Sequence, residues 1–249
     1  GIKPFYYTTA GGSFLFASEI KALLAHPEAG VKPNVSVLGT FLAWGVQDHS
    51  AGTMFEGIQQ LLPAHALRVT AEGMQEPFRY WDLRVNPEIR SPVPDDTVAR
   101  DFLGQLTDAT RIHLRSDVAV GTCLSGGIDS STLTVLINDI IRSDAPASVG
   151  ARQKTFSAVF RDPRFDESRY IDEVVAATGV DAHRTEPSPD QLWDDIGRLV
   201  YMQDEPFGSL SIYAQYCVMK LAKDHVKVVL DGQGAEELLA GYIGYQGSH

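Results

Sequence analysis

Glycines, hydroxyls and a carboxylate that could do chemistry are concentrated in residues 125–131, Ser-Gly-Gly-Ile-Asp-Ser-Ser. Two adjacent glycines let a backbone approach a ligand closely, three hydroxyls can donate to phosphate oxygens, and Asp129 is a natural ligand for Mg²⁺. A bare pair of glycines would indicate only a tight turn. The longer pattern predicts a phosphate and magnesium site made of Ser125, Gly126, Gly127, Asp129, Ser130 and Ser131.

The elements around this stretch suit that chemistry. The residues before it, 118–124, open with an apolar run that is typical of a strand buried in a parallel sheet. Apolar residues recur at roughly helical spacing over residues 128–142, which predicts a helix. The glycines then lie in a strand-to-helix turn, where the first N–H groups of the helix are unpaired and attract anions.

A second turn of the same kind follows near the end of the chain, where the apolar run 226–230 leads into residues 231–237, Asp-Gly-Gln-Gly-Ala-Glu-Glu. Ligands of parallel sheets bind outside the carboxyl ends of the strands. We therefore expect Asp129 and Glu236 to hold one Mg²⁺, which usually takes one or two protein carboxylates. The alternative is that Glu236 and Glu237 only complement the dipole of a helix.

Strands and helices are expected to alternate over the second part of the chain, which predicts an α/β fold with a doubly wound parallel sheet. The expected strands are 118–124, 155–160, 180–184 and 226–231, and the expected helices are 97–115, 128–142, 166–178, 189–202, 209–224 and 232–239. His113, on an apolar-leaning stripe of the first of these helices, is expected to be packed in the core.

The first part of the chain predicts an α+β module. Its expected elements are a hairpin of 5–9 and 13–17, helices at 18–25 and 35–44, and a strand at 66–70. Residues 86–94 carry three prolines in nine positions and are typical of a linker. The predicted domains are 1–85, a linker at 86–95, and 96–249.

The composition fits one large or two modest globular domains, with 249 residues, 44% hydrophobic and 21% charged. A formal net charge of −11 argues against nucleic acid or an anionic membrane as a partner. No apolar run is long enough for a membrane span and no signal-peptide layout opens the chain, so a cytoplasmic location is expected. Cys123 and Cys217 have no metal or redox spacing and are expected to be reduced core residues.

The motifs resemble those of known families. Residues 125–131 resemble the pyrophosphate loop Ser-Gly-Gly-x-Asp-Ser of the ATP pyrophosphatases, and no Gly-Lys-Ser/Thr follows as in a Walker loop. The stretch VVLDGQGAEELLAGY is similar to the second signature of asparagine synthetases, Ser-Gly-Glu-Gly-Ser-Asp-Glu. GIKPFYY, ASEIKALLAHP, GTMFEGIQQLLPAHALRV and RYWDL resemble the closing part of the family's glutaminase domain, a class II amidotransferase of N-terminal-nucleophile hydrolase fold.

The resemblance implies roles by position. Asp231 and Gly232 would contact the nucleotide, Leu124 and Ala158 the adenosine, and Glu236 the metal. Three residues depart from the family pattern: Glu236 replaces an aspartate, Asp231 replaces a serine, and Gln233 replaces a glutamate thought to manage protons. An amide cannot act as a general base. The implied catalytic residues are Asp129, Gln233 and Glu237.

The stretch Asp204-Glu205-Pro206 is similar to a family motif, but its acids equally suit solvated charges at a helix end. Ser209 and Ser211 follow where the family would hold an amino-acid substrate. The implied reaction uses ATP and Mg²⁺ to convert aspartate into a β-aspartyl-adenylate and pyrophosphate, after which glutamine-derived ammonia displaces AMP and gives asparagine.

Two alternatives stay open: an amidotransferase acting on another carboxylate, which Gln233 favours, and a nucleotide-binding module without turnover, which Glu236 favours. In the family, an N-terminal cysteine attacks glutamine. The chain has no such residue, so we expect it to be a fragment that is inactive by itself. The resemblance allows a homodimer.

Overall fold

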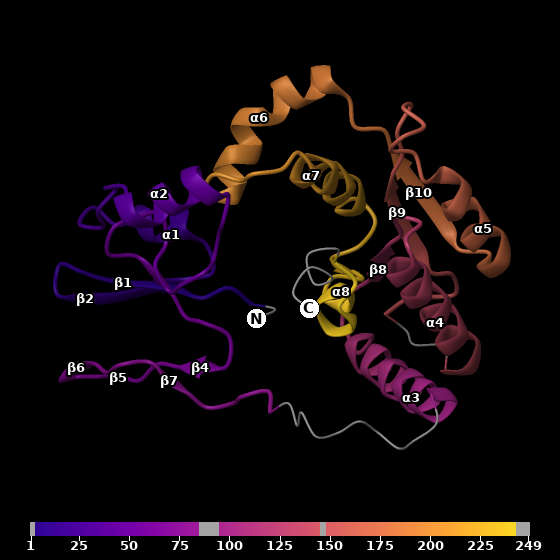
Figure 1. Cartoon of the computed structure of the whole chain (residues 1–249), viewed down its shortest axis with the longest axis horizontal. Coiled ribbons are helices and arrows are strands. Elements are labelled where there is room, and N and C mark those ends of the chain that lie inside the picture. Colours follow the sequence, from indigo (N-terminus) through magenta and orange to yellow (C-terminus); the bar gives the residue numbers. More distant parts are fainter. Residues whose placement is uncertain (1–2, 85–94, 145–147, 243–249) are drawn as a thin grey trace. The chain divides into compact units, whose positions relative to one another are not determined.

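The computed structural model describes residues 3–84, 95–144 and 148–242, which form two compact units (Figure 1). The first unit consists of Gly1–Arg90 together with Val200–Gly208, and the second of Ser91–Leu199 together with Ser209–His249. The predicted linker, residues 86–95, lies outside the described residues except for Asp95. Segment 200–208 packs in the first unit, although we had predicted all of 96–249 to be one domain.

The first unit is built on a three-stranded sheet in the order β2-β1-β3. As predicted, β1 (Tyr6–Ala10) and β2 (Ser13–Ala17) form an antiparallel hairpin, and Gly11 and Gly12 in its turn have φ of +56° and +75°. Ile20, Leu23 and Ile58 form the buried core beside this sheet. The remaining elements are α1 (Ile20–Leu24), α2 (Val35–Trp44), β3 (Gln59–Gln60), β4 (His65–Ala66), β5 (Val69–Thr70), β6 (Gly73–Met74) and β7 (Phe78–Arg79).

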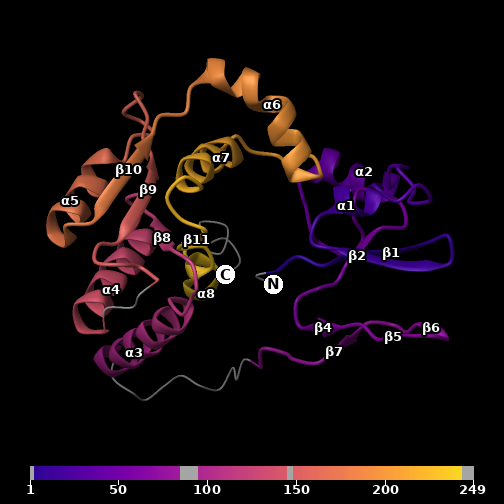
Figure 2. The same cartoon turned by 180° about the vertical axis from the view of Figure 1, so that it is seen from behind.

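The second unit contains a four-stranded parallel sheet in the order β10-β9-β8-β11, which confirms the predicted fold class (Figure 2). Its strands are β8 (Val120–Cys123), β9 (Lys154–Ala158), β10 (Asp181–Thr185) and β11 (Val228–Leu230). Its helices are α3 (Asp95–His113), α4 (Ile128–Asp144), α5 (Ser168–Thr178), α6 (Pro189–Gln203), α7 (Ser211–Ala222) and α8 (Ala235–Leu239).

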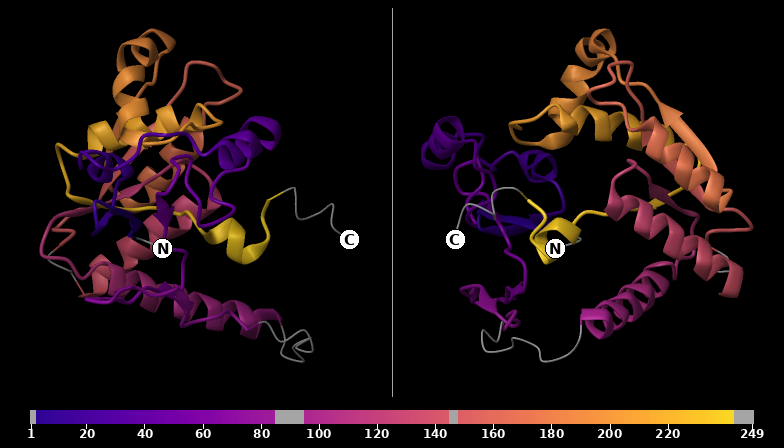
Figure 3. Two further views of the ribbon diagram at one scale, coloured as in Figure 1. Left: turned by 90° about the vertical axis from the view of Figure 1, so that its left-hand side faces the viewer. Right: turned by 45° about the vertical axis from the view of Figure 1, so that its right-hand side comes forward.

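Apolar side chains cover this sheet on both faces. One buried cluster joins Val120 of β8 to Ile137 and Ile140 of α4, and α3 runs beside α4 (Figure 3). A second cluster joins Phe156 of β9 to Val218 of α7, and α7 contacts both β9 and β10. Within β11, Leu230 packs against the first cluster and Val229 against the second, as the alternation of side chains along a strand requires.

Local signals placed several helix ends correctly. The Ser188 hydroxyl accepts a hydrogen bond from the Gln191 backbone N–H at 3.2 Å, and α6 begins at Pro189 as predicted. Gly179, with φ +72°, ends α5. The prediction for His113 was wrong: its side chain is exposed, and Thr110 and Leu114 are the buried residues near this end of α3.

The order of strands creates one reversal point. The chain runs outward from β8 through β9 to β10 and then returns to place β11 on the other side of β8. Strand β11 therefore lies beside β8 on the side away from β9. In open parallel sheets such a reversal opens a crevice at the carboxyl ends of the strands.

No helix in the described ranges is long and apolar enough to cross a membrane.

Gly121, in the middle of β8, tests the packing of this sheet. A Cβ at this position would lie 2.6 Å from Cε2 of Phe156 and 3.2 Å from the carbonyl oxygen of Lys154. Because both neighbours are held in the sheet, we expect Gly121→Ala to lower the free energy of unfolding by about 1–3 kcal/mol in urea titrations followed by circular dichroism.

Gly104→Ala in α3 is the matched control, since a Cβ there would meet nothing within 4 Å. This helical substitution should raise the free energy of unfolding by about 0.5–1 kcal/mol. Equal effects of the two substitutions would contradict the packing described for β8.

Candidate functional site

The turn after β8 is fixed to the neighbouring strand before it reaches its glycines. The Leu124 backbone N–H donates to the carbonyl oxygen of Phe156 at 3.0 Å, and the Ser157 hydroxyl donates to the carbonyl oxygen of Leu124 at 2.6 Å. The Leu124 side chain is fully buried. The residues that follow therefore start from a rigid point of the sheet.

The turn itself is closed by its own hydroxyls. The Ser125 and Ser130 Oγ atoms lie 2.9 Å apart, and Ser130 Oγ also accepts from the Ser125 backbone N–H at 3.1 Å. Gly126 has φ +94°, and a Cβ there would lie 3.1 Å from Cβ of Glu167. Glycine is thus required at position 126 both by the backbone angle and by the space available.

The turn after β11 touches the turn after β8. A Cβ at Gly232 would lie 3.1 Å from Cβ of Asp129 and 3.1 Å from the backbone nitrogen of Ser130. Since β8 and β11 are paired neighbours, this close approach follows directly from the strand order. The two glycine turns singled out from the sequence are therefore adjacent at one edge of the sheet.

A cavity of about 120 Å³ lies where the two turns meet. Four carboxylates line it, and no lysine or arginine is among its lining residues. A second cavity of about 440 Å³ adjoins it and shares Ser125, Asp129, Ser130 and Glu236 with it. The lining residues of the first are Ser125, Asp129, Ser130, Asp231, Gly232, Gln233, Gly234, Glu236, Glu237 and Tyr242.

Hydrogen bonds orient the acids of this cavity. The Tyr242 hydroxyl donates to Glu237 Oε1 at 2.8 Å, which lowers the pKa of Glu237 and raises the pKa of Tyr242 to about 12. The Gln233 backbone N–H donates to Asp231 Oδ1 at 3.3 Å. Glu237 therefore stays ionised near neutral pH, and the Asp231 side chain is held against its own turn.

The residues expected at the site divide into two groups. Ser125, Asp129, Ser130, Asp231, Gly232, Gln233, Glu236 and Glu237 share the first cavity, and Gly127 lines the second. Leu124, Gly126, Ala158 and Ser131 line neither cavity; Leu124 is in the core, and Ala158 packs against the cluster around Phe156. No sequence pattern assigns a role to Tyr242 or Glu167, because neither stands at a spacing typical of ligand-binding residues.

The donor set fits a magnesium ion bound together with a nucleotide. Asp129 and Glu236 face one cavity, and Mg²⁺ completes its coordination with water and phosphate oxygens. Across residues 3–84, 95–144 and 148–242, no group of three or more histidines, cysteines, aspartates or glutamates could hold a metal by itself. The site therefore suits an ion that arrives with phosphate ligands and does not suit a closed structural metal centre.

The parallel sheet, its two touching glycine turns and the acidic cavity define an α/β unit of the pyrophosphate-loop type. Comparison with known families agrees: residues 101–249 match the asparagine synthase family, and residues 1–81 match a glutamine amidotransferase domain. The chain belongs to the asparagine synthase family. Its relatives support the function of a glutamine-dependent amidotransferase family.

Several curated proteins are similar over nearly the whole chain. Asparagine synthetase [glutamine-hydrolyzing] 3 of Bacillus subtilis is 33% identical, over 97% of this chain and 40% of its own length. A putative asparagine synthetase of Methanocaldococcus jannaschii is 30% identical, over 98% of this chain and 45% of its own length. Amidase chyE of Penicillium rubens is 29% identical, over 99% of this chain and 37% of its own length. The chain thus spans less than half the length of these relatives.

Cys123, at the end of β8, reports on the charge of this site. Burial, with the carboxylate of Asp231 nearby, raises the pKa of the Cys123 thiol to about 12. Because the thiolate is the reactive form, we expect iodoacetamide at pH 8 to label Cys123 more than about a hundredfold more slowly in the native chain than in urea. Mass spectrometry of the peptides separates this label from that on Cys217.

Asp231→Asn removes the neighbouring charge but not the burial. It should lower the pKa of Cys123 and speed the labelling, without reaching the rate of the unfolded chain. Native labelling as fast as in urea would contradict the position described for this thiol.

Proposed function

We propose that this chain carries the nucleotide site of a glutamine-dependent amidotransferase that activates a carboxylate with ATP. The carboxylate oxygen would attack the α-phosphorus of ATP, forming an acyl-adenylate as pyrophosphate leaves. Ammonia would then attack the acyl carbon, forming the amide as AMP leaves. The observation that supports this most is the contact of Gly232 with Asp129, which brings the acids of both turns to one cavity.

The residues of the chain have distinct tasks in this proposal. The hydroxyls of Ser125 and Ser130, which bond to each other at 2.9 Å, would exchange that bond for phosphate oxygens. Asp129 and Glu236 would hold Mg²⁺, which neutralises phosphate charge when bound. The hydrogen bond from Tyr242 favours the ionised form of Glu237 by lowering its pKa and orients its carboxylate. Catalysis would rest on positioning and on charge stabilisation.

We further propose aspartate as the carboxylate substrate, with asparagine as the product. Support comes from the two Bacillus subtilis relatives, both named asparagine synthetase [glutamine-hydrolyzing]. Gln233 argues against assigning the relatives' reaction to this chain without change, because its amide cannot accept a proton as a base.

A second candidate is therefore amide formation on another carboxylate. The relative named amidase chyE, at 29% identity over 99% of this chain, supports it.

ATP binding by this chain tests the nucleotide site. Asp129→Asn removes one of the two carboxylates proposed for Mg²⁺ and should weaken binding of ATP in the presence of Mg²⁺ by about tenfold or more, measured by isothermal titration calorimetry. Asp139→Asn, on the same helix but outside both cavities, is the matched control and should leave the affinity unchanged. Equal affinities of both variants would refute the metal role of Asp129.

The acceptor is tested by pyrophosphate release from the complete polypeptide with ATP and Mg²⁺. We expect aspartate to stimulate the release, and mass spectrometry to detect asparagine once glutamine is added. Release that responds to another carboxylate but not to aspartate would favour the second candidate. Retained ATP binding with no release for any carboxylate would establish a nucleotide-binding module without turnover.

A further inference from the structure

Residues 200–208 pack with the first unit of the chain. They lie inside the stretch that matches the asparagine synthase family, residues 101–249, whereas the first unit otherwise contains the stretch that matches the glutamine amidotransferase domain, residues 1–81. From the sequence, the acids of this segment, Asp204 and Glu205, suited a family motif and solvated charges equally well. Their contacts inside the first unit show how that unit holds them.

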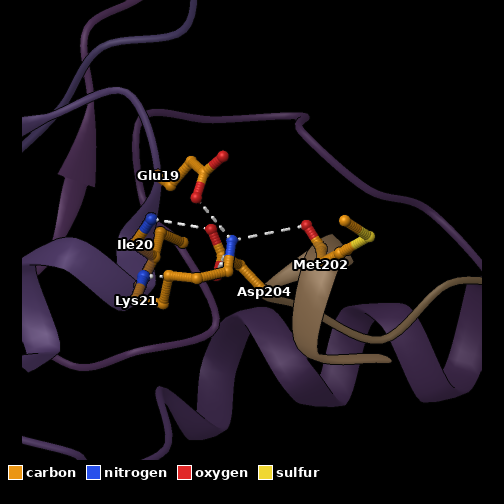
Figure 4. Close-up of polar contacts among 5 residues, drawn as sticks. All are labelled: Glu19, Ile20, Lys21, Met202 and Asp204. Carbon is orange, nitrogen blue, oxygen red and sulfur yellow. Dashed lines mark hydrogen bonds and ion pairs between the residues drawn. The ribbon is translucent and has the colours of Figure 1, made fainter. Parts of the chain in front are cut away.

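Asp204 is not a solvated charge. Its carboxylate accepts hydrogen bonds from the backbone N–H groups of Ile20 at 2.7 Å and Lys21 at 3.2 Å, and it lies 3.0 Å from Lys21 Nζ (Figure 4). The side chains of Asp204 and Lys21 are only 11% and 17% exposed. Lys21 Nζ also donates to the carbonyl oxygen of Met202 at 3.5 Å. The side chain of Glu19 does not cap α1, so Asp204 supplies the acceptor from a distant part of the sequence.

Two further contacts continue this pattern along the segment. The Glu205 carboxylate accepts a hydrogen bond from the Met54 backbone N–H, and the Gln47 side-chain amide donates to the carbonyl oxygen of Pro206. In each of these contacts the first unit provides the donor and the segment provides the acceptor. The two surfaces are therefore complementary in hydrogen bonding and not only in position.

The segment is seated on the first unit without entering its apolar core. Among the described residues, the cluster built on Ile20, Leu23 and Ile58 includes nothing from residues 200–208. Every partly buried residue packed against that cluster lies in the stretch 6–55. Within the segment, the exposed residues include Met202, Gln203 and Pro206.

The donor set favours acids in the segment. Backbone N–H groups of Ile20, Lys21 and Met54 point at its carboxylates, and a hydrogen bond to an ionised acceptor is about twice as strong as one between neutral groups. Proline has no N–H to present to a surface made of donors. Asp204 has φ +63°, a backbone conformation that aspartate tolerates better than most residues.

We propose that the donors at residues 20, 21, 47 and 54 form a peptide-docking site of the first unit, selective for two adjacent acids followed by proline. Residues 202–206 are the ligand of this docking site within the chain. Because the core of the first unit does not include them, the docking site should accept the same sequence from a separate peptide. The proposal is independent of nucleotide binding.

A separate peptide tests the docking site on the whole chain. The double variant Asp204→Ala/Glu205→Ala removes both carboxylates of the chain's own segment and should leave the docking site open. A fluorescent peptide with the sequence of residues 201–208 should bind this variant at least about tenfold more tightly than the native chain, where the attached segment competes at a high effective concentration. Fluorescence anisotropy measures both affinities, and equal affinities or no binding to the double variant would overturn the proposal.

Selectivity is tested by a second peptide in which asparagine and glutamine replace the two acids. It should bind the double variant at least about tenfold more weakly, because the charge of both acceptors is lost. Adding Lys21→Met to the double variant should weaken binding of the acidic peptide, whereas adding Glu19→Gln, which removes the other ion pair of Lys21 at 2.8 Å, should not. Equal binding of the acidic and amide peptides would contradict selection for acids.

Hydrogen exchange of the double variant shows whether the first unit keeps its fold. The amides of β1 and β2 should exchange as slowly as in the native chain, because the core beside this hairpin includes no residue of the segment. Faster exchange throughout the hairpin would make the segment an integral part of the unit and would also overturn the proposal. No nucleotide is present in these measurements, so failure of ATP binding in the earlier test would leave their result intact.

Discussion

The proposed nucleotide site depends on one close contact, between Gly232 and the start of α4. With Cβ of Asp129 and the backbone nitrogen of Ser130 only 3.1 Å from a Cβ at position 232, a larger residue there would require these neighbours to move by a few tenths of an ångström. The contact exists because β11 pairs directly with β8, which places both strand ends side by side. Glycine at position 232 thus favours the close approach that brings Asp129 and Glu236 to a common cavity.

Charge sets the second constraint on this site. Four carboxylates face the first cavity, and in the part of the chain that the structure describes neither cavity is lined by lysine or arginine. Phosphate groups brought into such a cavity would be repelled unless a cation accompanied them. The acids therefore suit the proposed role of ligands for an ion that carries phosphate.

The division of the chain into units does not follow the division of its sequence into family matches. Segment 200–208 belongs by sequence to the asparagine synthase part and by packing to the first unit. Its Asp204 satisfies two backbone N–H groups that are more than 180 residues away along the chain. A buried carboxylate with three donors is costly to displace, so this segment is held at least as firmly as an ordinary loop between two helices.

The sequence by itself determined the fold class, the hairpin of the first unit and the residues of both glycine turns. It also determined where α6 begins, at Pro189, and where α5 ends, at Gly179. These features depend on local periodicity, on caps and on glycines with positive φ, all of which act over a few residues. The tertiary structure alone decided that Asp204 accepts a hydrogen bond from the Ile20 backbone N–H, that Tyr242 bonds to Glu237, and that the core near the end of α3 uses Leu114 and leaves His113 exposed. Each of these depends on which distant segment supplies the partner, and local sequence patterns carry no record of that partner.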